Sequence, residues 1–287
     1  RNNFIKLLSM VPLAGIANNL SALENLTTIF SPTKKMPVLF FGHGNPMNAI
    51  NENEFVEGFK TVGKTLTKPN AILCISAHWF TKGTKVTAME MPKTIHDFGG
   101  FPQALFDVQY PAKGSPELAK TTKELLLPTE TVLDDEWGLD HGTWSVIKHL
   151  YPDADVPVIQ LSIDYTKPAS YHYELAKKLS VLRERGVLIV GSGNIVHNLR
   201  KVDFKRMDEV DYGFDWAIEA RAKFNQHILD GDFNPLLNYQ NMGSAIQLAV
   251  PTPEHYLPLI YSLALKDKKD KVSLFNDKMI AGSLSMT

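Results

Sequence analysis

Three of the nine histidines follow apolar stretches that have the composition of buried strands: His43 in LFFGHGNP, His78 in AILCISAHW and His197 in VLIVGSGNIVH. Neutral imidazole is the commonest protein ligand for metal ions and suits both Zn²⁺ and Fe²⁺. Open α/β sheets bind ligands beyond the carboxyl ends of their strands, so histidines far apart in the sequence can meet there. The glycines on either side of His43 let the backbone bend and a ligand approach closely. We therefore expect a metal site that contains these three histidines.

Two further histidines lie in loops that could hold a functional side chain. His141 lies in WGLDHGTW, where Asp140 can orient a neighbouring group and two tryptophans could form the wall of a pocket. His255 lies in VPTPEHYLP, just before a helix that we expect to begin near Glu254. We expect His255 to be a metal ligand, with Glu254 as its rival. A histidine-rich site with an open coordination position supports either metal-assisted hydrolysis or O₂ chemistry, and the spacing leaves both open.

Other residues near these motifs are expected to face a substrate. His96 lies in TIHDFGGFP, a loop whose glycines and phenylalanines could close over an aromatic ligand, although a purely structural histidine is the alternative. Asn45, after the first histidine turn, and Trp144 complete the expected substrate contacts. His172 and His227 lie in amphipathic helical stretches, and we expect them on the surface.

The elements around these motifs alternate between strands and helices. We expect strands over 37–42, 71–79, 85–91, 156–164, 187–194, 271–277 and 279–286. We expect helices over 52–66, 115–127, 143–152, 170–186, 214–231 and 253–265. Several of the strands are continuous apolar runs, as in strands that are covered on both faces. The pattern predicts a single α/β domain with a mostly parallel central sheet flanked by helices, and with the metal site at the carboxyl ends of the strands.

The composition excludes several classes of function. Lys and Arg number 30 against 31 Asp and Glu, and such a balance does not provide the basic surface that nucleic-acid binding needs. The single cysteine, Cys74, rules out an internal disulfide and a cysteine-based zinc cluster. No P-loop, GxGxxG or GxSxG motif follows a strand, and GSGN at 191–194 leaves a serine nucleophile at Ser192 only as a disfavoured option.

Residues 1–35 differ in character from the rest of the chain. The segment starts basic and then becomes apolar, as in an export signal, and its apolar part is too short to span a bilayer. The alternative is a helix packed on the domain and followed by a linker, so periplasmic export competes with a cytoplasmic location. We place the catalytic domain at 36–287 and expect no stable membrane insertion. Monomer and homodimer are both open.

Five motifs together resemble the 4,5-DOPA extradiol dioxygenase family of the class III extradiol ring-cleavage dioxygenases. They are GHGNPMNAI, ISAHWF, LDHGTWSVIKHLYPDADVPVIQLSID, VGSGNIVHNL and PTPEHYLPL, and they occur in order from about Met36 to the C-terminus. The resemblance implies a single α/β domain, non-haem Fe(II) as the working metal and Zn(II) as a surrogate found in bacterial members.

The resemblance also implies residue roles. His43, His78 and His255 match metal ligands, His197 matches a histidine on or near the metal, and His141 matches an acid/base or substrate-contacting group. The implied reaction inserts O₂ into a catechol-type, DOPA-like diol, with His197 or His141 removing a proton from the substrate. The alternatives are a zinc-dependent hydrolase that uses the same cluster and a non-catalytic member that binds a metal or an aromatic compound.

Overall fold

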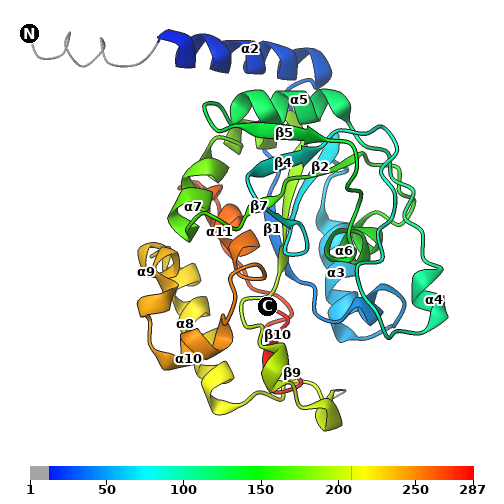
Figure 1. Cartoon of the computed structure of the whole chain (residues 1–287), viewed down its shortest axis with the longest axis vertical. Coiled ribbons are helices and arrows are strands. Elements are labelled where there is room, and N and C mark those ends of the chain that lie inside the picture. The colour runs from blue at the N-terminus through cyan, green and yellow to red at the C-terminus, as the bar shows by residue number, and fades with distance from the viewer. Residues whose placement is uncertain (1–12, 208) are drawn as a thin grey trace, which may run out of the picture.

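The apolar runs of the chain pair as one parallel sheet in the computed structural model, which describes residues 13–207 and 209–287 (Figure 1). The strand order is β1-β8-β2-β6. The strands are β1 Val38–Gly42, β8 Val187–Gly193, β2 Ala71–Ser76 and β6 Val158–Gln160. All residues of β2 and β8 are buried, because helices cover both faces of the sheet. The predicted fold class is confirmed.

Alternate residues of each strand face two different helical layers. Ile72 and Cys74 of β2 pack with Phe59 of α3 (Glu54–Thr65) and Trp144 of α6 (His141–Leu150). Their neighbours Leu73 and Ile75 lie in the core on the other face, with the buried residues of α7 (Ala169–Lys177) and α11 (Leu257–Ala264). Figure 1 shows these two pairs of helices on opposite sides of the strands. The two layers hold the sheet rigidly and leave its carboxyl edge free for a site.

Short elements extend this sandwich. Three two-stranded pairings surround the main sheet: β3 (Phe80–Thr81) with β7 (Ile163–Asp164), β4 (Thr84–Thr87) with β5 (Thr131–Asp134), and β9 (Met279–Ile280) with β10 (Leu284–Ser285). The remaining α-helices are α2 (Leu13–Ile29), α4 (Gln103–Phe106), α5 (Pro116–Leu125), α8 (Asp215–Asp230), α9 (Asn234–Leu237) and α10 (Ser244–Ala249). Among the described residues, no helix is both long enough and apolar enough to cross a bilayer.

The helix α2 lies on α5, at the top of Figure 1. Its side chains Ala22 and Leu26 are fully buried in the main core, and Asn25 donates a hydrogen bond of 2.9 Å to Glu124. Part of the N-terminal segment, residues 13–29, therefore packs on the domain. The basic start of the export-like stretch lies in residues 1–12, outside the described residues.

Several expectations about local structure were wrong. The helix expected over 170–186 ends at Lys177, and the strand expected over 279–286 is two short strands. The stretch 271–277 forms no strand, because it pairs with no neighbour in the described structure, and the strand expected over 85–91 ends at Thr87. The last long helix begins at Leu257 rather than near Glu254, since residues 254–256 form a turn that carries His255. His172 is fully buried, because its ring bonds to Tyr261 and to a backbone carbonyl rather than to solvent.

Candidate metal centre and active site

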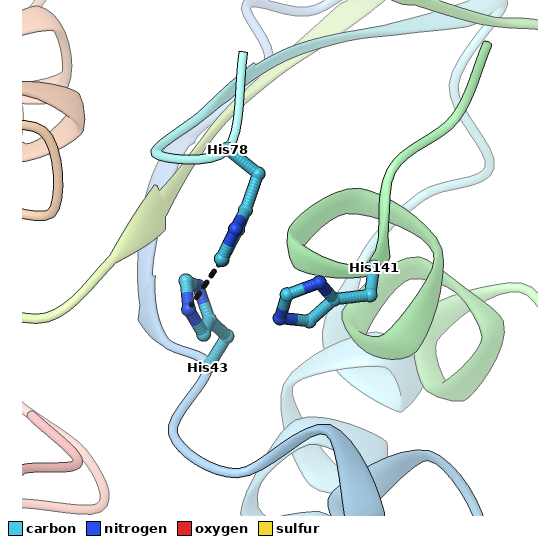
Figure 2. A group of neighbouring side chains, drawn as sticks. All are labelled: His43, His78 and His141. Carbon is cyan, nitrogen blue, oxygen red and sulfur yellow. Dashed lines mark hydrogen bonds between the residues drawn. The ribbon is translucent and has the colours of Figure 1, made fainter. Parts of the chain in front are cut away.

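The strands β1, β8 and β2 end level with one another. Gly42 pairs with Gly193, and Ser76 pairs with Ser192. The backbone N–H of His43 donates to the carbonyl of Gly193 at 3.0 Å, so the paired structure continues into the histidine turn. His43 and His78 therefore leave the sheet at the same edge, and Figure 2 shows both rings pointing toward one another beside His141.

The turn that carries His255 reaches this edge because β8 ends in glycine. A Cβ on Gly193 would lie 2.1 Å from the carbonyl oxygen of His255, a distance that real Cβ atoms do not show. The same carbonyl accepts a hydrogen bond of 2.9 Å from the backbone N–H of Asn194. The missing side chain thus admits His255 to the strand ends.

Five histidines gather at this edge, and we call them the floor of the site: His43, His78, His141, His197 and His255. The ring centroids of three of them form a nearly equilateral triangle. The centroid distances are 5.1 Å for His43–His78, 5.3 Å for His43–His255 and 5.2 Å for His78–His255. Ligand atoms lie within 4.8 Å of one another in the set His43, His78, His141 and in the set His197, Glu254, His255. The floor can therefore hold a metal ion.

The tautomer of His43 follows from its neighbours. The hydroxyl of Ser192 donates to the carbonyl of Gly142 at 2.5 Å, because a carbonyl can only accept. The Ser192 oxygen then accepts from Nδ1 of His43 at 3.0 Å. With the proton on Nδ1, the Nε2 atom of His43 carries a free lone pair, which is the form that binds a metal. Ser192 is thus an orienting group rather than a free nucleophile.

His78 and His255 each have a carboxylate beside Nδ1, with a hydrogen bond at His255 and a close contact at His78. Nδ1 of His78 lies 3.2 Å from a carboxylate oxygen of Asp97, and Nδ1 of His255 lies 3.3 Å from Glu254. A carboxylate offers only lone pairs, so the nitrogen beside it carries the proton and Nε2 is left free. The Nε2 atoms of His43 and His78 face each other at 3.3 Å. Two facing lone pairs repel unless a cation lies near both, so this donor set fits a divalent metal.

Burial keeps several of these rings neutral. It lowers the pKa of His43 and of His255 well below the ordinary histidine value, and repulsion from the neighbouring imidazoles lowers both pKa values further. Burial also lowers the pKa of His197 to about 4, although the nearby carboxylate of Glu254 acts in the opposite direction. Neutral imidazole is the form that can bind a metal or accept a proton.

His141 lies at the first position of α6, where Asp140 caps the helix by accepting from the backbone N–H of Thr143 at 3.0 Å. Asp140 is fully buried and also accepts from Ser76 and Gln160, both at 2.7 Å. These bonds satisfy its charge and leave it no contact with substrate. Asp140 therefore fixes the start of the helix and, through it, the position of His141.

Asp97 joins two floor histidines and was not predicted from the sequence. Its second carboxylate oxygen accepts from the backbone N–H of His141 at 2.9 Å and lies 3.0 Å from the ring Nδ1, which is not aligned for a hydrogen bond. Burial opposes ionisation of Asp97, but its contacts with His141 and His78 hold the pKa of the carboxyl well below its usual range. The only sequence signal was its place directly after His96, in a loop already assigned to the site.

The ring of His197 lies parallel to that of His255, with 3.5 Å between centroids and 10° between planes. An imidazole lone pair lies in the plane of its ring, so two stacked rings direct their lone pairs along parallel planes. One small ion cannot take both at normal Zn–N or Fe–N distances of about 2 Å. The stacking favours His197 as a neighbour of the metal rather than as a fourth ligand beside His255.

A cavity of about 860 Å³ opens above the floor. Asn45 lines it, and the side-chain oxygen of Asn45 accepts from the backbone N–H of Met47, which leaves its amide NH₂ for a ligand. His96 and Trp144 are not among the lining residues. His96 bonds to the carbonyl of Val108 at 2.9 Å, and the fully buried Trp144 donates to the carbonyl of Ile95 at 2.8 Å. Both pack behind Phe98.

Comparison with known proteins agrees with this geometry. Residues 37–280 match the family described as the catalytic LigB subunit of aromatic ring-opening dioxygenase. The chain is 47% identical to the 4,5-DOPA dioxygenase extradiol of Escherichia coli K12, over 90% of this chain and 95% of the relative. It is 35% identical to the Portulaca grandiflora protein of the same name, over 82% and 88% of the two chains.

The comparison with solved structures agrees with the comparison of sequences. A crystal structure of an uncharacterized Escherichia coli K12 protein superposes with a TM-score of 0.74 at 42% identity, covering 88% of this chain and 98% of that one. The predicted fold class and enzyme class are confirmed. The chain belongs to the LigB family of aromatic ring-opening dioxygenases.

Proposed function

We propose that this dioxygenase opens the ring of a catechol beside its diol, with Fe(II) held by His43, His78 and His255. The observation that carries the proposal is the common orientation of these three rings. Each has its Nδ1 beside a protein acceptor, on Ser192, Asp97 or Glu254, and each has Nε2 left for a metal. Orienting partners of this kind accompany nearly all histidines that bind metals.

A metal ion held by three protein ligands would keep further coordination positions open, and a reaction of a diol with O₂ needs such positions. Zinc and ferrous iron both accept imidazole nitrogen, and the geometry alone does not distinguish them. Ring opening by O₂ is redox chemistry, which Zn²⁺ does not perform, so we assign Fe(II) as the working metal and Zn(II) as a surrogate. When bound, the iron supplies the electronic route between the diol and O₂.

His141 and His197 are the groups that we propose for proton transfer. Both line the cavity, and the contact between Nδ1 of His141 and Asp97 leaves Nε2 of His141 for the substrate hydroxyl. Burial lowers the pKa of both rings, so each starts as a neutral base at pH 7. A base in this position accepts a proton from the diol and can return it to the opened product.

The substrate that we propose is a catechol-type diol, because both named relatives are 4,5-DOPA dioxygenases. Asn45 lines the cavity on the side of the first histidine turn and can donate to a substrate oxygen. His96 and Trp144 act at most through Phe98, which packs on His141 with 5.4 Å between ring centroids.

Anaerobic reconstitution with Fe(II), followed by a catechol and then O₂, tests this function. We expect uptake of O₂ and a ring-opened semialdehyde that absorbs in the visible, and we expect no product from protein loaded with Zn(II). An iron-loaded protein that leaves a broad panel of catechols intact would disprove the proposal.

Replacement of His43 tests the ligand assignment separately. His43→Ala removes one of three ligands and should abolish stoichiometric metal binding. His227→Ala, on the surface of α8, is the matched control. Full metal content in the His43→Ala protein would overturn the assignment.

A further inference from the structure

We propose that an apolar wall at the mouth of the cavity selects catechols with an uncharged, apolar ring substituent. The wall consists of Leu199, Val202, Phe204, Met207 and Val210, which all line the cavity. This inference rests on the proposed function, because it concerns the part of the substrate that lies away from the diol.

The size of the cavity gives the first argument. Its volume of about 860 Å³ is in the range that holds whole drug-sized ligands, and a bare catechol ring at the floor would fill only a small part. The lining also includes other apolar residues, among them Met47, Ile50 and Phe101, and the uncharged polar side chains of four asparagines, Asn45, Asn48, Asn51 and Asn53. A ring substituent that extends from the floor would therefore meet only uncharged side chains and the already paired Glu52.

The exposure of the wall gives the second argument. Phe204 is 77% exposed, Leu199 is 61% exposed and Val210 is 43% exposed, although all three border a cavity. Clustered apolar side chains on a protein surface commonly mark a binding site. A ligand in this cavity would remove them from water, and that burial is favourable only if the part of the ligand that touches them is apolar.

Charge gives the third argument. Among the described lining residues there is no lysine or arginine, and the one carboxylate is Glu52, which already pairs with Lys60. Arg206, next to the wall, is held by Glu209 and lies 3.3 Å over the ring of Tyr212. Arg200, Lys201 and Lys205 lie in the same segment but are exposed and do not line the cavity. A carboxylate held among the lining residues would therefore lose water without gaining a cationic partner, which is costly.

The wall is anchored well enough to act as a surface. The backbone N–H of Asp203, next to Phe204, donates to the carbonyl of Ala281 at 3.0 Å, and Tyr212 donates to the Asp203 carboxylate at 3.2 Å. The first bond joins the segment to residue 281, and the second joins it to Tyr212. The exposed ring of Phe204 thus has a fixed base from which it can contact a ligand.

Anaerobic titration of the Fe(II)-loaded protein separates this inference from the proposed function, because binding is then measured without turnover. Calorimetry would use catechol, 4-methyl-, 4-ethyl-, 4-propyl- and 4-butylcatechol, L-DOPA and 3,4-dihydroxybenzoate. We expect the dissociation constant to fall by up to about fourfold for each methylene buried. L-DOPA and 3,4-dihydroxybenzoate should bind more weakly than the alkylcatechols of similar size.

Two variants and one control localise the effect. Phe204→Ala should weaken the dependence of the dissociation constant on the length of the alkyl substituent. Phe204→Arg should improve the binding of 3,4-dihydroxybenzoate relative to 4-methylcatechol. Leu229→Ala, which removes an exposed apolar side chain on α8 outside the cavity lining, should change neither. Equal dissociation constants along the alkyl series, or tighter binding of the carboxylated catechols, would overturn the inference. O₂ is admitted afterwards, so tightening along the series without ring opening would support the wall and refute the dioxygenase.

Discussion

At the floor of the cavity each of the three histidines that we propose as metal ligands has Nδ1 beside a protein acceptor, whereas the mouth presents apolar side chains that are largely exposed. His43 and His78 of the floor follow the ends of buried, hydrogen-bonded strands, and the turn of His255 packs against the end of β8. The mouth stands on a segment with only short 3₁₀ turns. Positions that must place atoms within a few tenths of an ångström are thus built on the sheet. Positions that contact the variable part of a substrate are built on a loop.

The largest difference between the two regions should appear in the free energy of unfolding when a methyl group is added to the floor. Gly193→Ala places a Cβ against the carbonyl of His255, and backbone cannot move aside cheaply. We expect a loss of about 3 kcal/mol in urea unfolding, together with loss of metal binding. Gly99→Ala is the control, since a Cβ there meets nothing within 4 Å. Equal stability of the two variants would contradict the close approach at the floor.

The second largest effect is expected when the charge of Asp97, which lies beside Nδ1 of His78, is removed. Asp97→Asn can place an NH₂ group, which is a donor, beside Nδ1 of His78 and would favour the tautomer that carries its proton on Nε2. We expect metal affinity to fall about 10- to 100-fold in competition with a chelator. Asp107→Asn, at an exposed residue directly after α4, should leave the affinity as it is. An unchanged affinity in Asp97→Asn would mean that the carboxylate does not orient His78.

His172 sharpens the comparison because it is a buried histidine with both nitrogens occupied. One faces the hydroxyl of Tyr261 at 2.8 Å and the other donates to the carbonyl of Asp164 at 3.2 Å. Burial lowers the pKa of His172 to about 4, although the bond to Asp164 acts in the opposite direction. Unlike the floor histidines, it has no open position for a metal, so its burial affects stability alone.

The sign of the resulting pH dependence follows from proton binding. Between the unfolded pKa near 6.5 and the folded pKa of about 4, the unfolded chain binds the proton more tightly, so stability falls as the pH falls through this window. From pH 7 to pH 5 the contribution of His172 should decrease by about 2 kcal/mol. In urea titrations at both pH values, His172→Gln should lose less free energy of unfolding between pH 7 and pH 5 than the wild type. Equal losses in the two proteins would show that His172 does not contribute to this pH dependence.

The smallest effect on stability is expected at the mouth. Phe204→Ala removes a side chain that is 77% exposed, so the free energy of unfolding should change by no more than about 0.5 kcal/mol. Urea unfolding of Phe204→Ala, with Leu229→Ala as the control, measures this change. A loss of several kcal/mol would show that the ring is part of a packed structure and not a free wall.

Much of this site could be predicted because its residues follow strands. His43 and His78 come directly after apolar runs, and the parallel pairing of such runs brings their ends to one edge. A helix cap is likewise local: the hydroxyl of Ser115 accepts from the backbone N–H of Leu118 at the start of α5. Local chemistry decides both kinds of feature, so a single sequence carries them.

The orienting partners could not be read in this way. Ser192 on β8 reaches His43 across the sheet, and Asp97 reaches His78 and His141 from a loop, so both contacts depend on tertiary structure. No spacing rule connects residue 97 with residues 78 and 141. His96, the more conspicuous neighbour of Asp97, packs behind the cavity instead. A titratable side chain in a motif indicates a site, but its direction is set by the packing around it.

The sandwich of helices and parallel strands, and the histidines at its carboxyl edge, could be predicted from the amino-acid sequence, because apolar periodicity and strand ends are local properties. The free nitrogen of each histidine, the stacking of His197 on His255 and the exposed apolar wall beside the cavity became visible in the folded chain alone. Hydrogen-bond partners, ring stacking and exposure depend on pairs of segments that folding brings together.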